Sequence, residues 1–199
     1  KRVFNWKPIS FEKTLIDRPK IIRELEKLKY PLYFIDYETY SPVIPMFDGY
    51  RPYQRIVFQF SLHVQEKPGD KLKHYEYLCQ EEKDPTEELL KELKKHIKKP
   101  GTFISWNASF EMGCNREMAD RAPKFQRFYN DINNSMFDLM QIFRKGYYVD
   151  RNFHGSASIK KVLPVLVPKL SYKDLNIQEG GTASESWAIL TDKNIKKTA

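Results

Sequence analysis

The chain has 199 residues, of which 41% are hydrophobic, and its 34 Lys and Arg outnumber its 26 Asp and Glu to give a formal charge of +8. This length and composition predict one α/β domain with an ordinary hydrophobic core, and the charge favours polyanionic partners such as nucleic acid, although a solvated lysine-rich helix surface explains the same excess. No apolar run reaches the roughly 18 residues of a membrane helix, no signal peptide is evident, and the two cysteines form no Cys-x-x-Cys, so we expect a cytoplasmic protein without a membrane partner, a zinc ribbon or a disulfide scaffold.

The first 30 residues are predicted to form an extension that precedes the main domain. This extension, 1–30, contains one amphipathic helix over 19–28, which begins after Asp17 and carries its apolar side chains on one stripe. Residues 31–199 are predicted to form the main domain. Because the sequence begins with Lys1 and ends without a helix stop signal, we expect it to be part of a longer protein.

An aromatic and β-branched run over 32–38 is predicted to form a buried strand that carries two carboxylates. Alternate side chains of a strand share a face, so Asp36 and Glu38 point the same way while Ile35 and Tyr37 pack on the other side. Burial and mutual repulsion disfavour two neighbouring anions unless a cation lies between them. Mg²⁺ and Mn²⁺ prefer carboxylate oxygens, so this Asp-x-Glu is a candidate half of a metal site. The alternative is a strand with one solvated face.

The next two elements are predicted to form a β-hairpin. A loop over 41–54, rich in Pro, Gly, Tyr and Arg, precedes the clearest alternation in the chain. Every second residue from Ile56 to Val64 is apolar, which predicts that these side chains share the buried face of a strand. A turn at 67–70 leads to the hairpin partner, 73–79.

Helices and strands are predicted to alternate in the rest of the chain. The segment 84–87, Asp-Pro-Thr-Glu, is typical of a capped helix start, and this helix is predicted to end near Lys99. A buried strand over 102–106 leads directly into another helix. The remaining predicted elements are a helix after Pro123, a short segment over 136–142 and a helix over 158–166.

A second acidic position follows the strand over 102–106. Asn107 lies at the carboxyl end of that strand and Glu111 in the first turn of the next helix, where the ligands of open α/β sheets collect. The alternative is structural, because an acid near a helix amino terminus stabilises the helix dipole and an asparagine there can cap it.

These motifs resemble those of the DnaQ-like, or DEDD, family of 3′-to-5′ exonucleases, which have a ribonuclease-H-like fold. The family's first motif, Asp-x-Glu, is matched by Asp36 and Glu38, and its second motif, Asn-x-x-Phe-Asp, is matched by Asn107, Phe110 and Glu111. Glutamate at the last position is one methylene longer than the family's aspartate. The resemblance implies an α/β fold with a mixed sheet, three antiparallel strands and then parallel strands, flanked by helices.

The chain resembles one bacterial branch more closely, the domain-of-unknown-function family 2779. That branch is commonly joined to a RecB-type nuclease domain, so the resemblance implies such a domain as a partner in the full-length chain. The segments that carry the resemblance are 51–54, 58–63, 106–111 and 154–164.

The resemblance implies a metal-dependent 3′-to-5′ exonuclease that hydrolyses phosphodiester bonds of DNA or RNA with two divalent ions, Mg²⁺ or Mn²⁺. Asp36 would bridge the ions, and Glu38 and Glu111 would each ligate one of them. Asp138 follows a short predicted strand, where many such exonucleases carry an aspartate, and is a further candidate metal ligand. Asn107 would orient the site.

Four more residues are candidates for contacts with a single-stranded end of the substrate. Tyr53 can stack on a terminal base, although loop aromatics also fasten loops to domains. Lys160 and Lys161 can contact phosphates as point charges, and an ordinary helix surface is the alternative. His154 has no aspartate at the offset of a general base, so we expect a structural or substrate-contacting role for it.

The superfamily's third motif, which supplies the last carboxylate and the general base, does not occur before Ala199. We expect that motif just beyond the present end, so that this piece lacks one metal ligand. The alternative functions are a catalytically inactive ribonuclease-H-like module that binds nucleic acid or a partner nuclease, and a purely structural domain of a larger protein.

Overall fold

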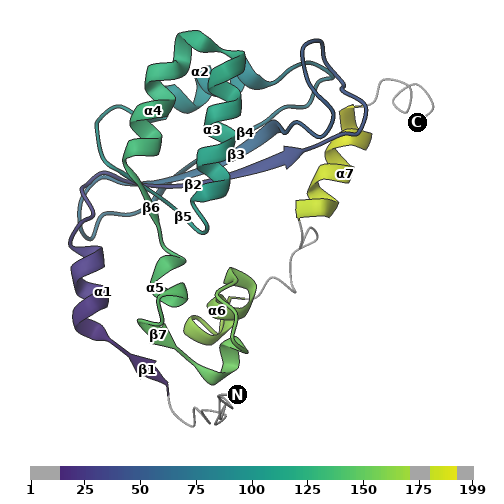
Figure 1. Ribbon diagram of the computed structural model, residues 1–199. Coiled ribbons are helices and arrows are strands. Elements are labelled where there is room, and N and C mark those ends of the chain that lie inside the picture. The colour runs from purple at the N-terminus through teal and green to yellow at the C-terminus, as the bar shows by residue number, and fades with distance from the viewer. Residues whose placement is uncertain (1–13, 171–179, 192–199) are drawn as a thin grey trace, which may run out of the picture. The chain divides into compact units, whose positions relative to one another are not determined.

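The computed structural model describes residues 14–170 and 180–191 (Figure 1). The chain divides into two compact units, and the predicted domain boundary after residue 30 stays a prediction. Unit 1 comprises residues 1–27 and 140–172, and unit 2 comprises residues 28–139 and 173–199.

Unit 2 is built around a five-stranded mixed sheet with the strand order β4-β3-β2-β5-β6. The first three strands in this order pair antiparallel, whereas β5 pairs parallel with both β2 and β6. This confirms the predicted α/β fold, and the arrangement is consistent with a ribonuclease-H-like sheet. The strands are β2 (Leu32–Tyr40), β3 (Ile56–Gln65), β4 (Lys73–Leu78), β5 (Thr102–Ser105) and β6 (Met136–Asp138).

Three helices cover one face of this sheet (Figure 1). They are α2 (Thr86–His96), α3 (Ser109–Arg121) and α4 (Gln126–Asn134). Their apolar stripes pack on alternate side chains of β2, and Ile35 and Tyr37 are each only 3% exposed. The predicted facing of β2 is therefore confirmed, and burial of this apolar surface is the main stabilising term of unit 2.

A β-bulge changes which side chains of β3 point to each face of the sheet. The register between β2 and β3 shifts between Glu38 and Thr39, so an extra residue on β3 reverses the alternation. Val57 joins the core under the three helices, whereas Ile56 and Phe58 belong to a second apolar cluster. The prediction that every second side chain from Ile56 onward shares one face is wrong for this reason.

The second cluster is covered by α7 (Gly180–Thr191), a helix that was not predicted. The Trp187 ring stacks on Phe58 with 4.7 Å between ring centroids, and its Nε1–H donates to the carbonyl of Cys79 at 2.7 Å. The Ser184 hydroxyl donates to the carbonyl of Thr39 at 2.6 Å, beside the bulge. These contacts fix α7 to the ends of β2 and β3.

Unit 1 is made of short elements. Its two strands pair antiparallel, and Asp150 accepts a hydrogen bond from the Thr14 hydroxyl at 2.6 Å. In the ranges that the structure describes, no helix combines the length and the hydropathy needed to cross a bilayer. The elements of unit 1 are β1 (Leu15–Ile16), α1 (Arg18–Leu25), α5 (Gln141–Arg144), β7 (Tyr148–Val149) and α6 (Ile159–Leu166).

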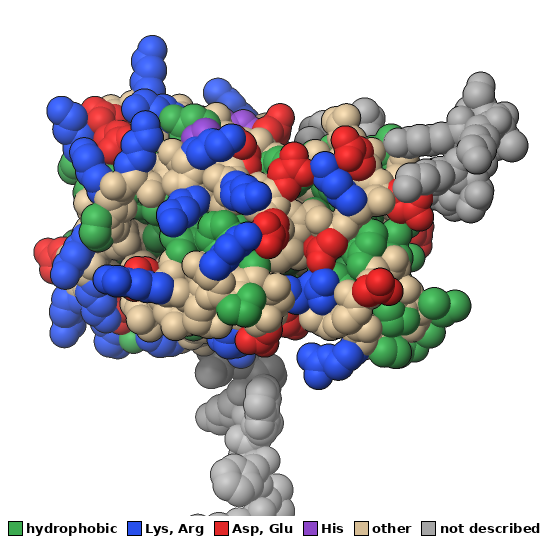
Figure 2. Space-filling model, turned by 90° about the horizontal axis from the view of Figure 1, so that it is seen from above, with side chains coloured by type: hydrophobic (Ala, Val, Ile, Leu, Met, Phe, Trp, Pro, Cys, Tyr) green, Lys and Arg blue, Asp and Glu red, His purple; other side chains and the backbone are tan. Residues whose placement is uncertain are grey.

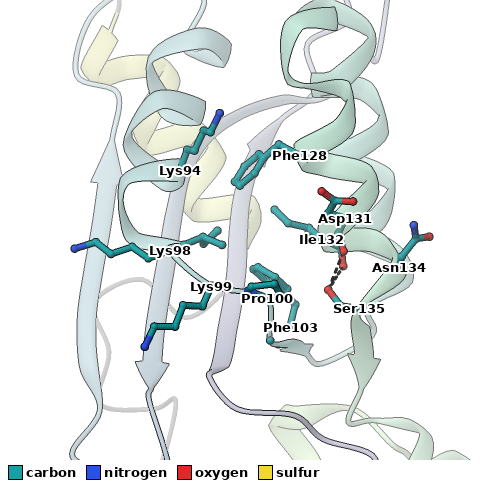
Figure 3. A pocket seen from close by; sticks show the side chains of 12 residues that line it. Lys94, Lys98, Lys99, Pro100, Phe103, Phe128, Asp131, Ile132, Asn134 and Ser135 are labelled. Atoms are coloured by element: carbon teal, nitrogen blue, oxygen red, sulfur yellow. Dashed lines mark hydrogen bonds between the residues drawn. The ribbon is translucent and has the colours of Figure 1, made fainter.

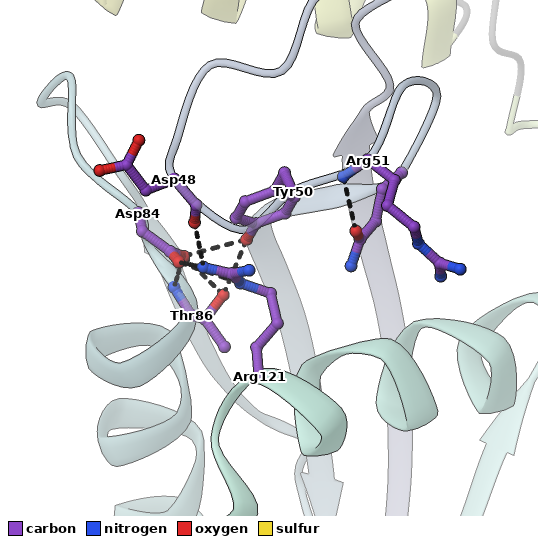
Figure 4. Close-up of polar contacts among 7 residues, drawn as sticks. Asp48, Tyr50, Arg51, Asp84, Thr86 and Arg121 are labelled. Atoms are coloured by element: carbon purple, nitrogen blue, oxygen red, sulfur yellow. Dashed lines mark hydrogen bonds and ion pairs between the residues drawn. The ribbon is translucent and has the colours of Figure 1, made fainter.

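Asp84 fastens the loop over 41–54 to the start of α2 and the end of α3 (Figure 4). One carboxylate oxygen accepts hydrogen bonds from the Thr86 N–H at 3.0 Å and from the Tyr50 hydroxyl at 3.0 Å. The other accepts from Arg121 Nη2 at 2.7 Å, and the Arg121 guanidinium lies 3.6 Å from the centroid of the Tyr50 ring. Burial alone would raise the pKa of Asp84, but the hydrogen bonds from Thr86 and Arg121 lower it.

We expect Asp84→Ala to lower the free energy of unfolding by about 2–3 kcal/mol, because the variant loses the acceptor of the first N–H of α2 and leaves Arg121 without its carboxylate. Urea denaturation measures the change. Asp48→Ala is the matched control, because Asp48 offers Arg121 only its backbone carbonyl, and it should change stability by less than about 0.5 kcal/mol. Equal losses in the two variants would contradict the role of Asp84.

Candidate functional site

The candidate residues lie at the carboxyl ends of neighbouring strands in unit 2. Ser105 of β5 pairs with Asp138 of β6, and Phe34 of β2 pairs with Ile104 of β5. Two residues beyond Phe34, Asp36 is level with the residue that follows β5. Because β2, β5 and β6 run parallel, their ends meet at one edge of the sheet, which is where α/β proteins bind ligands.

Glu111 is a buried acid in the first turn of α3, with 2% of its surface exposed. Its Oε2 accepts a hydrogen bond from the Ser105 hydroxyl at 3.0 Å. Burial raises the pKa of Glu111 to about 7, and the negative charges of Asp36 and Asp138 add to that effect. The carboxyl groups of Asp36 on β2 and Asp138 on β6 therefore both lie within range of the charge of Glu111 on α3.

Asp36 and Glu38 extend this acidic group along β2. The Asp36 side chain is exposed, yet the protein around it displaces enough water to raise its pKa. Glu38 is half-buried, and its pKa is raised first by burial and then by the charge of Asp36. Within residues 14–170 and 180–191, neither carboxylate forms an ion pair.

The positive charge of Arg55 acts on Glu111, but Arg55 forms its ion pair with Glu117. Its Nε donates to Glu117 at 3.0 Å, and Nη2 pairs with the same carboxylate. The hydrogen bond with Glu117 is the main reason that the pKa of Arg55 is raised, and the charge of Glu111 contributes less. The acidic group around Glu111 is therefore not neutralised by this arginine.

The turn between β5 and α3 is fixed to β6 by a hydrogen bond. Asn107 has a left-handed backbone, φ 70°, which asparagine tolerates better than most residues. Its N–H donates to Asp138 Oδ1 at 3.0 Å, and its own Oδ1 accepts from the Ser109 hydroxyl at 3.0 Å. Asp138 thus holds the turn that leads into the helix of Glu111.

A buried polar chain sets the distance between β2 and α3. The Tyr37 hydroxyl donates to Asn115 Oδ1 at 2.9 Å, and Asn115 Nδ2 donates to Asn133 Oδ1 at 2.8 Å. Asn115 and Ser105 were not among the predicted site residues. The available signal was polarity within an apolar pattern, since Ser105 ends a buried strand and Asn115 follows Cys114 on the buried side of α3.

The acids of this edge suit a hard divalent cation by their chemistry. Carboxylate oxygens are the ligands that Mg²⁺ and Mn²⁺ prefer, and a cation would offset the effects of burial and of neighbouring carboxylates that raise the pKa of Glu111. In the described part of the chain, no group of three or more His, Cys, Asp or Glu is arranged to hold a metal ion. Asp36, Glu38, Glu111 and Asp138 therefore stay predicted ligands.

The four predicted substrate contacts lie in two different units. Tyr53 is 68% exposed in the loop over 41–54 of unit 2, with a left-handed backbone at φ 60°. His154 is exposed and also left-handed, and Lys160 and Lys161 are exposed in the first turn of α6. These last three belong to unit 1, so their role at the site rests on the sequence resemblance alone.

Comparison with known proteins shows similarity to a family without an assigned function. A family model described as "Domain of unknown function (DUF2779)" matches residues 33–158. "Uncharacterized protein MG366 homolog" of Mycoplasma pneumoniae is 32% identical over 181 residues, which cover 80% of this chain and 27% of that protein. "Uncharacterized protein MG366" of Mycoplasma genitalium is 30% identical over 179 residues, which cover 80% of this chain and 26% of that protein. The chain thus spans about a quarter of the length of these relatives.

We expect the raised pKa of Glu111 to make stability fall as pH rises. Between its unfolded pKa of 4.5 and its folded pKa of about 7, the folded state keeps a proton that the unfolded state has lost. The stabilisation is complete below pH 4.5 and is lost by about pH 8, an effect of about 3 kcal/mol.

The measurement is urea denaturation at pH 4.5, 6 and 8, with Glu111→Gln as the test variant. Glutamine cannot titrate, so the free energy of unfolding of the variant should fall much less than that of the wild type between pH 4.5 and pH 8. Asp120→Asn, at an exposed position on the same helix, should keep the wild-type profile. Parallel profiles for the wild type and Glu111→Gln would contradict the assignment.

Proposed function

The chain belongs to the DUF2779 family, and from that premise we propose that it is a metal-dependent 3′-to-5′ exonuclease-like domain that hydrolyses phosphodiester bonds of DNA or RNA. The observation that carries the proposal is the buried Glu111, whose pKa is raised by burial and by the charges of Asp36 and Asp138. Perturbed acids of this kind cluster at functional sites. The resemblance to the DnaQ-like exonucleases supplies the reaction class.

The proposed ligands are Asp36, Glu38 and Glu111, with Asp138 as a further candidate. Divalent ions bound there would supply the positive charge that polarises a phosphodiester and lowers the pKa of an attacking water. The hydroxyl of Ser105 orients the Glu111 carboxylate toward this edge. Glutamate at this position has a longer reach than aspartate, which suits a ligand that starts from a buried position on α3.

The alternative is a ribonuclease-H-like module that binds nucleic acid or a partner nuclease without cutting. The observation that favours it is the same pKa of about 7, because a carboxyl that is partly neutral near pH 7 and bonded to Ser105 is tolerated without a metal ion. Both functions use the basic character of the chain. They differ in whether the acids at the sheet edge take up a cation.

We expect the chain to bind Mn²⁺ and Asp36→Asn to weaken that binding at least about tenfold, because a neutral amide replaces a charged ligand. Titration calorimetry gives the affinity. Asp120→Asn removes the same charge from an exposed position on α3 and should bind Mn²⁺ as the wild type does. An equal effect of the two substitutions would show that Mn²⁺ senses only the overall charge.

We expect the complete protein to shorten single-stranded oligonucleotides from the 3′ end in the presence of Mn²⁺, and Asp36→Ala to abolish this activity. Electrophoresis of a 5′-labelled substrate shows the products. Full activity of Asp36→Ala would refute the assignment of the site. Salt-dependent binding without cleavage by the wild type would refute the enzyme and support the binding module.

A further inference from the structure

A cavity of about 540 Å³ opens between α4 and the segment that joins α2 to β5 (Figure 3). Its volume is in the range of pockets that hold small ligands. Gly101 and Phe103 line it at the amino end of β5, whereas Ser105 and Glu111 belong to the carboxyl end of the same strand. The cavity is therefore separate from the acidic edge described above.

The floor of the cavity is apolar and partly aromatic. Phe103 and Ile132 are almost fully buried, at 3% and 1% exposure. Phe103 stacks on Tyr33 with ring centroids 4.7 Å apart, which fixes its position. Phe128 is half-buried on α4, and in Figure 3 its ring lies at one end of the cavity. A flat hydrophobic group would find a ring to pack against here.

Three lysines surround the mouth of the cavity. Lys94 Nζ lies 6.0 Å from the centroid of the Phe128 ring. The heads of Lys98 and Lys99 point away from the cavity in Figure 3, and their flexible four-carbon stems allow them to turn toward a ligand at its mouth. Figure 2 shows many Lys and Arg side chains on the face seen from above, with apolar side chains exposed between some of them.

These three lysines, of which Lys94 lies on α2 and the other two follow it, differ from Lys91 and Lys95 of that helix. Lys91 pairs with Glu87, and Lys95 pairs with Glu92, so a solvated helix surface accounts for both. In the described ranges, Lys94, Lys98 and Lys99 form no ion pair. Their charges are available for an anion.

The opposite wall carries acceptors and a donor for hydrogen bonds. Asp131 and Asn134 are exposed at the carboxyl end of α4 and line the cavity. The Ser135 hydroxyl donates to the carbonyl of Asp131 at 2.8 Å, which holds this end of the helix in place. A carboxylate repels phosphate but accepts hydrogen bonds from sugar hydroxyls. The two walls therefore suit different parts of one molecule.

We propose that this cavity binds a nucleoside phosphate, with the base against Phe128, the phosphates toward Lys94, Lys98 and Lys99, and the ribose hydroxyls toward Asp131. An aromatic ring, lysines whose flexible stems can turn toward the mouth, and an exposed carboxylate match the three parts of such a ligand. The volume of about 540 Å³ suits a single nucleotide unit better than an extended acidic peptide. The source is a free nucleotide or the end of a nucleic-acid strand, and the site does not depend on the exonuclease proposal.

Titration calorimetry with ADP in the presence of EDTA tests the site without divalent ions. We expect a dissociation constant below about 1 mM. Phe128→Leu keeps an apolar side chain but removes the ring, and it should weaken binding at least about fivefold. Asp131→Asn should reduce the preference for ADP over 2′,3′-dideoxy-ADP, because an amide accepts hydrogen bonds from the ribose less strongly.

Two double variants test the role of charge, one as the test and one as its matched control. Lys98→Gln with Lys99→Gln should weaken the binding of ADP at least about fivefold and leave the affinity for adenosine unchanged. Lys67→Gln with Lys71→Gln removes the same charge from exposed positions near the β3–β4 turn and should leave ADP binding unchanged. Equal losses in the two double variants, or no binding of ADP by the wild type, would overturn the proposal.

Two further experiments show whether ADP binds away from the acidic edge and whether the natural ligand is a free nucleotide or the end of a strand. Asp36→Asn should bind ADP as the wild type does, and a loss of binding in that variant would overturn the proposal by placing ADP elsewhere. Displacement of ADP by a short single-stranded oligonucleotide supports the site with a strand end as its source. ADP binding that resists displacement supports the site with a free nucleotide as its source.

Discussion

The burial of Glu111 among other carboxyl groups is the constraint on which the candidate site depends. A buried carboxyl is disfavoured as an anion, and the charges of Asp36 and Asp138 disfavour it further. One hydrogen bond from Ser105 and the amino terminus of α3 partly offset this cost. Arg55 cannot complete the compensation because its guanidinium is paired with Glu117. The negative charge at this edge is thus relieved either by binding a cation or by protonation of Glu111.

The scaffold holds these acids near one another through polar contacts that cross between elements. The buried chain from Tyr37 through Asn115 to Asn133 connects β2 with α3 and α4. The hydrogen bond from Asn107 to Asp138 connects the β5–α3 turn with β6. The buried part of these contacts, from Tyr37 to Asn115, favours one arrangement of β2 and α3 over others. These contacts therefore hold the acids near one another despite their mutual repulsion.

Some of this arrangement was predictable from sequence because it follows from local periodicity. The two-residue repeat of β2 places Asp36 and Glu38 on one face and buries Ile35 and Tyr37 on the other, as the structure shows. The bulge opposite Glu38 was missed, although the apolar Val57 between Ile56 and Phe58 interrupts the alternation of β3 at that point. The polarity of Ser105 at the end of a buried strand was a sequence signal, but the strand pattern does not identify its partner, Glu111, six positions later on a helix.

The helix α7 shows a different limit of sequence reasoning. Its weakly patterned sequence gives little helical periodicity, and tertiary contacts explain its position: Trp187 stacks on Phe58, and Trp187 and Ser184 donate hydrogen bonds to backbone carbonyls. The cavity between α4 and β5 shows a third limit, because its walls come from segments that are separate in the chain. In the described ranges three of its lysines form no ion pair, a difference from their neighbours Lys91 and Lys95 that a lysine-rich sequence pattern does not reveal.

Diffraction from crystals of the complete protein soaked in MnCl₂, recorded at the manganese absorption edge, tests the central idea most directly. We expect an anomalous peak bounded by Asp36 and Glu111, at ligand distances of about 2.1–2.3 Å, with the Glu111 carboxylate turned toward it. Glu111 still bonded to Ser105, with no peak at this edge of the sheet, would contradict the proposed metal centre.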